Sequence, residues 1–553
     1  MIRSRVSCWP LALLVFAMAR PGGLAAQFND PPAPAAYALQ GVTVVQADGS
    51  TLAGVTLVVR GDRIEAMGAE VQVPADAKLL EGDTLYVYPG IFDAHGEADY
   101  EFPEIEVDRS GIASWNPPRQ VQSFMPHRRV VDYLTATGDD LAGQRKAGVV
   151  AAAIHPEGRL MPGRGTVLVF RADADTPGGL VAQPELGPLM TFQAAAGVYP
   201  SVLFSVIAFY RQMFEDAGHQ AAHVRAFNRD PASLPPPIWD ADMEIVRSLM
   251  GGSTPAFFAV DFGRDIQRVL KLAAEYDFRP IIVGGEEAWK VADELVAADV
   301  PVLVSLDFPE PERWEPRNDN GDEEEELDAA PLREKQRIED IYSNAGRLAA
   351  AGVRFALTSG GGKADILEGA RKAIEYGLSE QDALNALTAT PASLFDLDYL
   401  ARVRARGPAT FVVTDAPIFD EEMEIRYVFV EGAMEKGREA GAAGEEPAVD
   451  MTGTWDVDID AEGQSIAAKM TVTQEGAGFE GTMTTPFGEA EVRDGLVSGN
   501  DVSFTVVFAV GGESMEVEMT GTVEGDRGSG SGESPDGSFT WTAKRTGGPG
   551  EEN

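Results

Sequence analysis

The sequence predicts an α/β protein built on a (β/α)8 TIM-like barrel, with a composite β-sandwich and a separate C-terminal all-β domain. Three patterns carry this prediction. Apolar strands alternate with amphipathic helices over 89–400, strand-rich segments flank that region at 36–88 and 405–432, and short strands of alternating polarity follow at 448–545. Repeated strand–helix units over about 300 residues suit a closed parallel barrel, for which about 250 residues is typical.

The first 26 residues have the order of a secretory signal peptide. Arg3 and Arg5 precede an apolar run at 9–19, and small residues near Ala25 offer a cleavage site. The run is shorter than the ~20 residues that a membrane span needs. We therefore expect signal peptide 1–26 to direct export, to a bacterial periplasm or outside the cell. The one cysteine, Cys8, lies inside this segment, so we expect no disulfides in the mature chain.

The charge of the chain excludes several classes of partner. With 88 acidic and 45 basic residues, the formal net charge is −43. Such a charge repels nucleic acid and anionic lipid, so we expect neither as a partner. The acidity suits a solvated surface, and the 553 residues and 44% apolar composition allow several domains with ample cores.

The segments at 36–88 and 405–432 read as strands separated by glycine-containing turns. The predicted strands are 37–45, 55–60, 63–67, 409–414 and 425–430. Two strand-rich pieces on either side of a barrel join most simply into one composite sandwich.

Within 89–400, the predicted strands lack polar alternation, as strands buried on both faces should. They are 148–154, 256–260, 280–283, 300–304 and 353–357. Ile266, Val269, Leu270 and Ala273 repeat with helical spacing, as do residues 288, 291, 292 and 295. The sequence 379–382 has the form of a capping box at the start of another helix.

Two stretches differ in composition from the rest. The acidic segment 309–331 follows a predicted barrel strand and reads as a solvated loop, with a lid over the barrel mouth as the alternative. A linker rich in Gly, Ala and Glu at 433–447 leads into the C-terminal β domain, whose opening Gly453-Thr454-Trp455 is similar to the start of lipocalin-like barrels.

The stretch 85–97, with Pro89-Gly90 followed by Asp93 and His95, resembles the first barrel strand of the amidohydrolase superfamily. Further landmarks occur in the family's order and are closest to its imidazolonepropionase-related branch. They are 146–150, 156–165, 278–288 and 383–392. The resemblance covers about residues 36–432. It implies a metal-dependent hydrolase of carbon–nitrogen bonds other than peptide bonds, acting on small amides or cyclic amides at the barrel mouth.

The resemblance also implies metal ligands, and few are retained. His95 matches the first histidine of strand one, whereas Glu97 replaces the second. Strands five and six end without histidine, and Gly360 stands where the strand-eight aspartate is expected. We therefore expect an altered site, with His95 and Glu97 as candidate ligands, and Asp261 as a third, for one divalent, zinc-like ion. The alternative for Glu97 is an ion pair with Arg159 or Arg164.

The other histidines favour structural roles. His155 ends the second predicted strand and points towards the mouth, but a hydrogen-bonded structural histidine is the simpler interpretation. His219 and His223 are four residues apart yet lack the glutamate of a zinc-binding helix, and His127 adjoins two arginines.

Two functions from different classes remain. One is an exported hydrolase of the amidohydrolase type with an altered metal site, for which the catalytic residues stay unassigned. The other is a catalytically inactive homologue, acting as a binding protein, a homo-oligomer or the partner subunit of an active paralogue. A binding role for the C-terminal β domain is a third hypothesis.

Overall fold

The computed structural model describes most of the chain, and the fold is taken from these residues. They are 36–80, 84–103, 111–309, 329–437, 449–461, 464–475, 478–486, 488–498, 500–510, 513–534 and 537–547. The predicted signal peptide 1–26, the acidic stretch 310–328 and most of the linker, 438–448, lie outside them. No helix among the described residues is long and apolar enough to cross a membrane.

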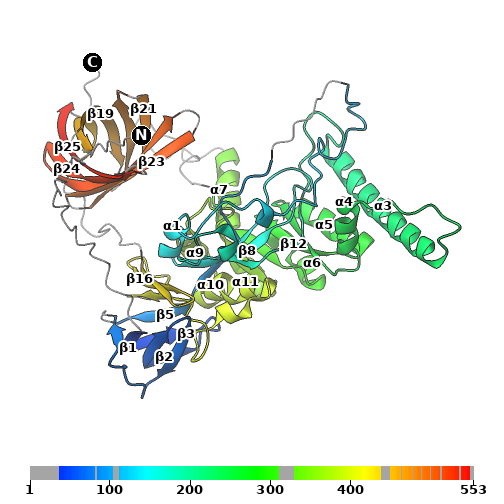
Figure 1. The fold of residues 1–553 in the computed structure, drawn as a ribbon, viewed down its shortest axis with the longest axis horizontal. Helices are drawn as coiled ribbons and strands as arrows, with labels where there is room; N and C mark the ends of the chain where they lie inside the picture. Colours follow the sequence, from blue (N-terminus) through cyan, green and yellow to red (C-terminus); the bar gives the residue numbers. More distant parts are fainter. Residues whose placement is uncertain are drawn as a thin grey trace, which may run out of the picture.

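One sheet combines strands from both sides of the central region (Figure 1). Its strands are β1 (Ala36–Val45), β2 (Thr51–Arg60), β3 (Arg63–Gly68), β4 (Ala77–Leu79), β5 (Tyr86–Pro89), β15 (Phe411–Thr414), β16 (Ile425–Val430) and β17 (Ala433–Lys436). The order is β17-β16-β15-β5-β1-β2-β3, with β4 beside β1. The join is the antiparallel pair β5–β15, where Pro89 faces Phe411. Both ends of the central region are therefore held at one place.

A five-stranded parallel sheet forms the larger part of the central region. It runs β10 (Leu189–Thr191), β11 (Pro255–Val260), β12 (Arg279–Gly284), β13 (Val302–Ser305) and β14 (Phe355–Thr358) in spatial order. The predicted strands over these residues are confirmed to within about two residues at each end, the usual uncertainty in element boundaries. Their apolar runs are buried on both faces, which explains why they lack alternation.

The remaining strands of the central region form a second sheet. They are β6 (Ile91–Gly96), β7 (Val149–Ile154), β8 (Thr166–Val169) and β9 (Val181–Gln183). Strand β6 is parallel to β7, but β8 returns antiparallel to β7 and pairs with β9. This differs from the predicted (β/α)8 barrel, because the chain turns back after β7 without a crossover helix. The described strands of the central region thus lie in two sheets, which contact each other where β6 meets β14.

Helices surround these sheets (Figure 1). They are α1 (Ala142–Lys146), α2 (Pro177–Leu180), α3 (Leu203–Arg229), α4 (Ala241–Leu249), α5 (Gly263–Tyr276), α6 (Ala292–Ala297), α7 (Ala329–Tyr342), α8 (Asn344–Ala351), α9 (Ile366–Glu375), α10 (Glu380–Leu387) and α11 (Ala389–Leu394). Three short 3-10 helices are Val130–Asp132, Ala288–Val291 and Asp398–Ala401.

The predicted helix signals are confirmed at α5 and α10. The side chain of Ser379 accepts a hydrogen bond from the backbone N–H of Asp382, as the capping pattern predicts. The long helix α3 was not predicted. Its buried residues end at Ala217, so its second half has no buried face that would produce a clear apolar period.

The interior between the two sheets is filled by apolar side chains. They include Phe92 of β6, Phe257 of β11, Leu303 of β13 and Phe395, which follows α11. Phe395 stacks against both Phe92 and Phe257, with ring centroids 5.4 and 6.0 Å apart. The interior is therefore a packed core, and polar groups gather at the ends of the strands.

The C-terminal strands form a closed antiparallel barrel (Figure 1). They are β18 (Gly453–Ala461), β19 (Gln464–Glu475), β20 (Gly478–Thr485), β21 (Gly488–Ser498), β22 (Asp501–Val510), β23 (Glu513–Glu524), β24 (Arg527–Ser534) and β25 (Gly537–Gly547). Each strand pairs with its neighbour in sequence, and β25 returns to β18. Trp455 is completely buried, and its indole N–H donates to the Met451 carbonyl at 2.8 Å. A closed all-β domain is thus present, while its kinship to lipocalins stays a prediction.

We predict that this barrel folds by itself. Its core residues, from Met451 to Ala543, belong to a cluster of their own, and closure leaves no sheet edge that needs another domain. A fragment from Val449 to Gly547 should therefore unfold in one cooperative thermal transition, monitored by near-ultraviolet circular dichroism. Trp455→Ala should lower its unfolding free energy by about 3–5 kcal/mol. A fragment without cooperative unfolding would show that the barrel depends on the rest of the chain.

Candidate functional site

Two imidazole rings meet at the carboxyl ends of β6 and β7. His95 lies near the end of β6, and His155 directly follows β7. The parallel register, with Gly96 opposite Ile154, brings the two rings together. Their centroids are 5.2 Å apart and their planes are nearly perpendicular. Both line a cavity of about 280 Å³ with Glu97.

His155 is buried without a hydrogen-bond partner. Its exposed fraction is 3%, and neither ring nitrogen has a partner in hydrogen-bonding geometry among the described residues, although the Ala94 carbonyl lies beside the ring. The Phe257 ring packs against it at 4.5 Å. The expectation of a hydrogen-bonded structural histidine is therefore wrong. A buried ring without a hydrogen-bond partner lowers the stability of the folded protein by about 1–3 kcal/mol. A bound group that forms a hydrogen bond with the ring would remove this penalty.

Both imidazoles are held in the neutral form. Burial, and then the nearby positive charge of Lys363, lower the pKa of His95 to about 4. Burial also lowers the pKa of His155 well below its usual range, and a positive charge on His95, were that ring protonated, would lower it further. A neutral imidazole keeps one ring nitrogen free to accept a proton. The pair can thus act as acceptors or bases at neutral pH.

Asp93 ties the end of β6 to the end of β14. Its buried carboxylate accepts hydrogen bonds from the backbone N–H of His95 at 3.1 Å and from the N–H and hydroxyl of Ser359 at 3.2 and 2.5 Å. The carbonyl of His95 in turn accepts from the N–H of Gly361 at 2.8 Å. Burial raises the pKa of Asp93, against the opposing effect of the Ser359 hydroxyl. These bonds fix the backbone that carries His95.

A run of three glycines lies shortly after β14, and its middle residue, Gly361, lines the cavity beside His95. Gly360, Gly361 and Gly362 have φ angles of 74°, 85° and 78°, a left-handed conformation that favours glycine. A Cβ atom at Gly361 would lie 3.6 Å from Nε2 of His95, and one at Gly362 would overlap Oε2 of Glu97. The absence of a side chain at Gly362 therefore leaves room for Glu97, whereas a Cβ atom at Gly360, where the resemblance predicts an aspartate, would meet Oγ of Ser305.

Glu97 is exposed at the cavity and does not pair with the arginines considered for it. Arg164 forms an ion pair with Glu185, and Arg159 donates to the Ala194 carbonyl at 2.7 Å. The predicted ion pair of Glu97 with Arg159 or Arg164 is therefore wrong. A carboxylate at the rim of the cavity stays hydrated, so it needs no buried counter-ion.

A second set of charged groups lies at the carboxyl ends of β11, β12 and β13. Asp261 follows β11, Glu286 follows β12 and Asp307 follows β13. Burial raises the pKa of Asp261, which the charge of Lys363 opposes. Burial and then the charge of Asp261 raise the pKa of Glu286. Lys363 thus acts electrostatically on both sets of groups.

The structure brings no other histidine to this site. His127 contacts Asp242 at 2.6 Å, with half of its side chain exposed. His219 and His223 lie on α3, where His223 contacts the Pro235 carbonyl at 3.0 Å. The structural interpretation of these three histidines agrees with their positions.

The donors present do not fit a two-metal hydrolytic centre. Such a site needs about three protein ligands for each ion. Within the described ranges, no group of three or more His, Cys, Asp or Glu side chains is arranged to hold a metal. The Asp93 carboxylate is engaged by Ser359 and the His95 backbone, and Gly360 offers no side-chain donor. A single ion on His95 and Glu97 remains a prediction.

Three features of the site were missed by the sequence reasoning: the role of Asp93, the charge of Lys363 and the unpartnered ring of His155. One of them had a local signal. Asp93, His95 and Glu97 alternate along an extended segment, so their side chains share one face. The other two depend on segments far apart in sequence, which no local pattern brings together.

Comparisons with known proteins support the fold. No protein-family model matches the chain, and no curated protein matches it. Among solved structures, an amidohydrolase from Thermotoga maritima has a TM-score of 0.57 at 21% identity, covering 73% of this chain and all of that one. A prolidase complexed with N-methylphosphonate-L-proline and N-isopropylammelide isopropylaminohydrolase from Burkholderia multivorans give TM-scores of 0.43 and 0.39, at 15% and 17% identity. They cover 73% and 72% of this chain, and 100% and 97% of theirs. The chain thus has the fold of the Thermotoga amidohydrolase.

We predict that His95 makes stability fall in mild acid. The folded-state pKa of His95, about 4, lies below the unfolded value of 6.5. Between these two pH values the unfolded chain takes up a proton at His95 and the folded protein does not. The unfolding free energy is therefore highest above pH 6.5 and decreases as the pH falls towards 4. His95→Gln should therefore show a smaller decrease in unfolding free energy across this window. Urea denaturation followed at 222 nm, where the helices of the central region dominate, measures it.

His219→Gln, at an exposed position of α3, is the matched control and should behave as the wild type does. An equal pH dependence for wild type and His95→Gln would show that His95 titrates normally in the folded protein.

Proposed function

We propose that this chain is a hydrolase of the amidohydrolase type that acts on a carbon–nitrogen bond, other than a peptide bond, in a small amide or cyclic amide. The single observation that carries the proposal is the pair of neutral imidazoles in the cavity at the carboxyl ends of β6 and β7, one of which has no partner. Residues that follow the strands at this end are the ones that perform chemistry in barrel enzymes.

The chemistry assigned to this site is general acid–base catalysis by an imidazole. One neutral ring takes a proton from a water molecule as the water oxygen bonds to the substrate carbonyl carbon. The resulting imidazolium then gives its proton to the leaving nitrogen as the carbon–nitrogen bond breaks. The products are a carboxylic acid and an amine, or one ring-opened molecule, and the protein recovers its proton state.

Lys363 supplies the positive charge for the same reaction. Its charge acts on both His95 and Asp261, so an ammonium group lies within electrostatic range of the cavity. A cation near the attacked carbonyl stabilises the oxyanion of the tetrahedral intermediate. Glu97, at the rim, orients the amide N–H groups of a neutral substrate, for which a carboxylate is a suitable acceptor.

A catalytically inactive homologue is the second candidate, and a specific observation favours it. Gly360 replaces the family's aspartate, and the described residues contain no group of three metal ligands. In this case the cavity binds the amide without cleaving it, and the chain acts as a binding protein, alone or as the partner of an active paralogue. The two candidates differ in whether a bound amide is recovered intact.

We predict hydrolysis that depends on the imidazole pair and not on metal. Purified protein should open cyclic amides such as hydantoin or dihydrouracil, with products followed by liquid chromatography and mass spectrometry. His155→Ala and His95→Ala should each reduce the rate by roughly 10²–10⁴-fold, the range for loss of a general base. His219→Ala is the control and should retain full activity.

Elemental analysis and treatment with a chelator complete the test. We expect less than one tightly bound metal ion per chain and unchanged activity after chelation. Two equivalents of zinc together with activity that chelation abolishes would restore the two-metal mechanism. Amides that bind but are recovered intact would favour the inactive homologue.

The proposed place of action is outside the cytoplasm, in a bacterial periplasm or beyond the cell. The order of basic, apolar and small residues in 1–26 supports this proposal. We predict that protein recovered from its native host begins near Gln27, as intact mass measurement would show. A soluble protein that retains Met1 would contradict export.

A further inference from the structure

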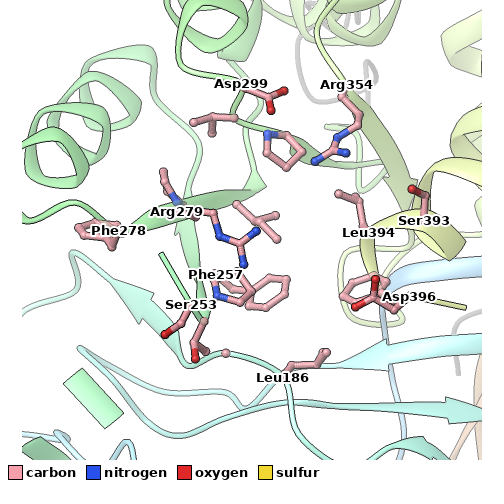
Figure 2. A pocket seen from close by; sticks show the side chains of 18 of the residues that line it. Leu186, Ser253, Phe257, Phe278, Arg279, Asp299, Arg354, Ser393, Leu394 and Asp396 are labelled. Carbon is pink, nitrogen blue, oxygen red and sulfur yellow. The ribbon is translucent and has the colours of Figure 1, made fainter. Parts of the chain in front are cut away.

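A second hollow lies at the opposite end of the parallel sheet. Its volume is about 660 Å³, more than twice that of the imidazole cavity. Pro255 and Arg279 begin β11 and β12, and Pro301 and Arg354 directly precede β13 and β14. All four residues line this hollow, which therefore opens at the amino ends of these strands (Figure 2). It is separate from the site proposed for hydrolysis.

The walls of the hollow combine polar and apolar groups, and the polar groups make up the larger part of the accessible wall. The apolar part is formed by Leu186, Phe257, Ile281, Leu394 and Phe395, with smaller contributions from prolines. The ring of Phe257 lines the hollow and also packs against His155. One aromatic ring therefore separates the hollow from the imidazole pair.

Two arginines extend into this hollow (Figure 2). Arg279 enters from β12 and Arg354 from the residue before β14, with β13 between the two strands. Within the described part of the chain, neither guanidinium group has a hydrogen bond or an ion pair with a side chain or a backbone carbonyl. By contrast, Arg145 and Arg171 each contact a glutamate through two nitrogen atoms.

Both arginines are available to a ligand. Arg279 and Arg354 are exposed residues, so their guanidinium groups are solvated in the hollow, and no carboxylate among the described residues holds them. An anion bound in the hollow is attracted by both positive charges. Arginine binds carboxylates in a planar, two-pronged geometry, so a carboxylate suits the site.

Three carboxylates restrict the charge of that anion. Asp299, Asp396 and Glu185 line the hollow. Glu185 forms an ion pair with Arg164, and neither aspartate forms an ion pair with Arg279 or Arg354. Their negative charges disfavour a ligand with several charges, such as a polyphosphate, whereas one carboxylate between two guanidinium groups is still attracted. The apolar part of the wall adds affinity for a ligand with a hydrophobic body.

We propose that this hollow is a binding site for a small monocarboxylate with an apolar or aromatic body. The carboxylate lies at Arg279 and Arg354, and the apolar body packs against Phe257 and Ile281. The site does not depend on the hydrolytic function, because none of the residues proposed for catalysis takes part in it.

Isothermal titration calorimetry on the full-length mature protein tests the proposal, with phenylacetate as the probe. Phenylacetamide, which has the same body without the charge, should bind much more weakly, as should acetate and inorganic phosphate. Arg279→Gln and Arg354→Gln should each weaken phenylacetate binding by roughly tenfold to a hundredfold, the range for hydrogen bonds to a charged group. Added salt should weaken it as well, because screening reduces the attraction of partly exposed charges.

Two control variants separate this site from others. Arg247→Gln, on the surface of α4, should leave phenylacetate binding unchanged. His155→Ala should retain phenylacetate binding even where it abolishes amide hydrolysis, so failure of one proposal is distinguishable from failure of the other. Equal binding of phenylacetate and phenylacetamide, no effect of either arginine variant, or binding of inorganic phosphate as tight as that of phenylacetate would each overturn the proposal.

Discussion

The buried carboxylate of Asp93 is the group on which the geometry of the central region depends. Strands β6 and β14 belong to different sheets, and no strand ladder joins the two sheets among the described residues. Asp93 joins them by accepting hydrogen bonds from His95 and Ser359, and Gly361 adds a bond back to the His95 carbonyl. A buried carboxylate with several donors is stable only while all of them stay in place. Both edges of the imidazole cavity are therefore held by one side chain.

This arrangement holds the site without any group of three or more metal ligands among the described residues. Hydrogen bonds between Asp93 and Ser359 join the two strand ends, and the absence of a side chain at Gly362 leaves room for Glu97. The imidazoles are positioned by backbone that is already fixed, so they are preorganised for a ligand. The ring nitrogens of His155, which have no hydrogen-bond partner among the described residues, can then form a hydrogen bond with a bound ligand.

The two hollows of the central region differ in the chemistry of their polar groups. At the carboxyl ends of the strands, two neutral imidazoles and the Glu97 carboxylate line a small cavity, which suits an uncharged substrate with a polar bond. At the amino ends, two arginines without a protein partner among the described residues line a hollow of mixed polar and apolar walls, which suits a charged head on a hydrophobic body. Phe257 and Phe395 pack between the two ends and keep them separate. One scaffold can therefore hold two ligands of different kinds.

The sequence by itself determined the features that depend on neighbouring residues. Apolar runs predicted the buried strands, helical spacing predicted α5, and the capping pattern predicted the start of α10. Only the tertiary structure decided the features that depend on distant segments. The antiparallel return of β8, the Asp93–Ser359 bond across 266 residues, the meeting of His95 with His155 and the convergence of Arg279 with Arg354 are all of this kind. Local patterns report which face of an element is apolar, but which strand lies beside it is settled by packing of the whole chain.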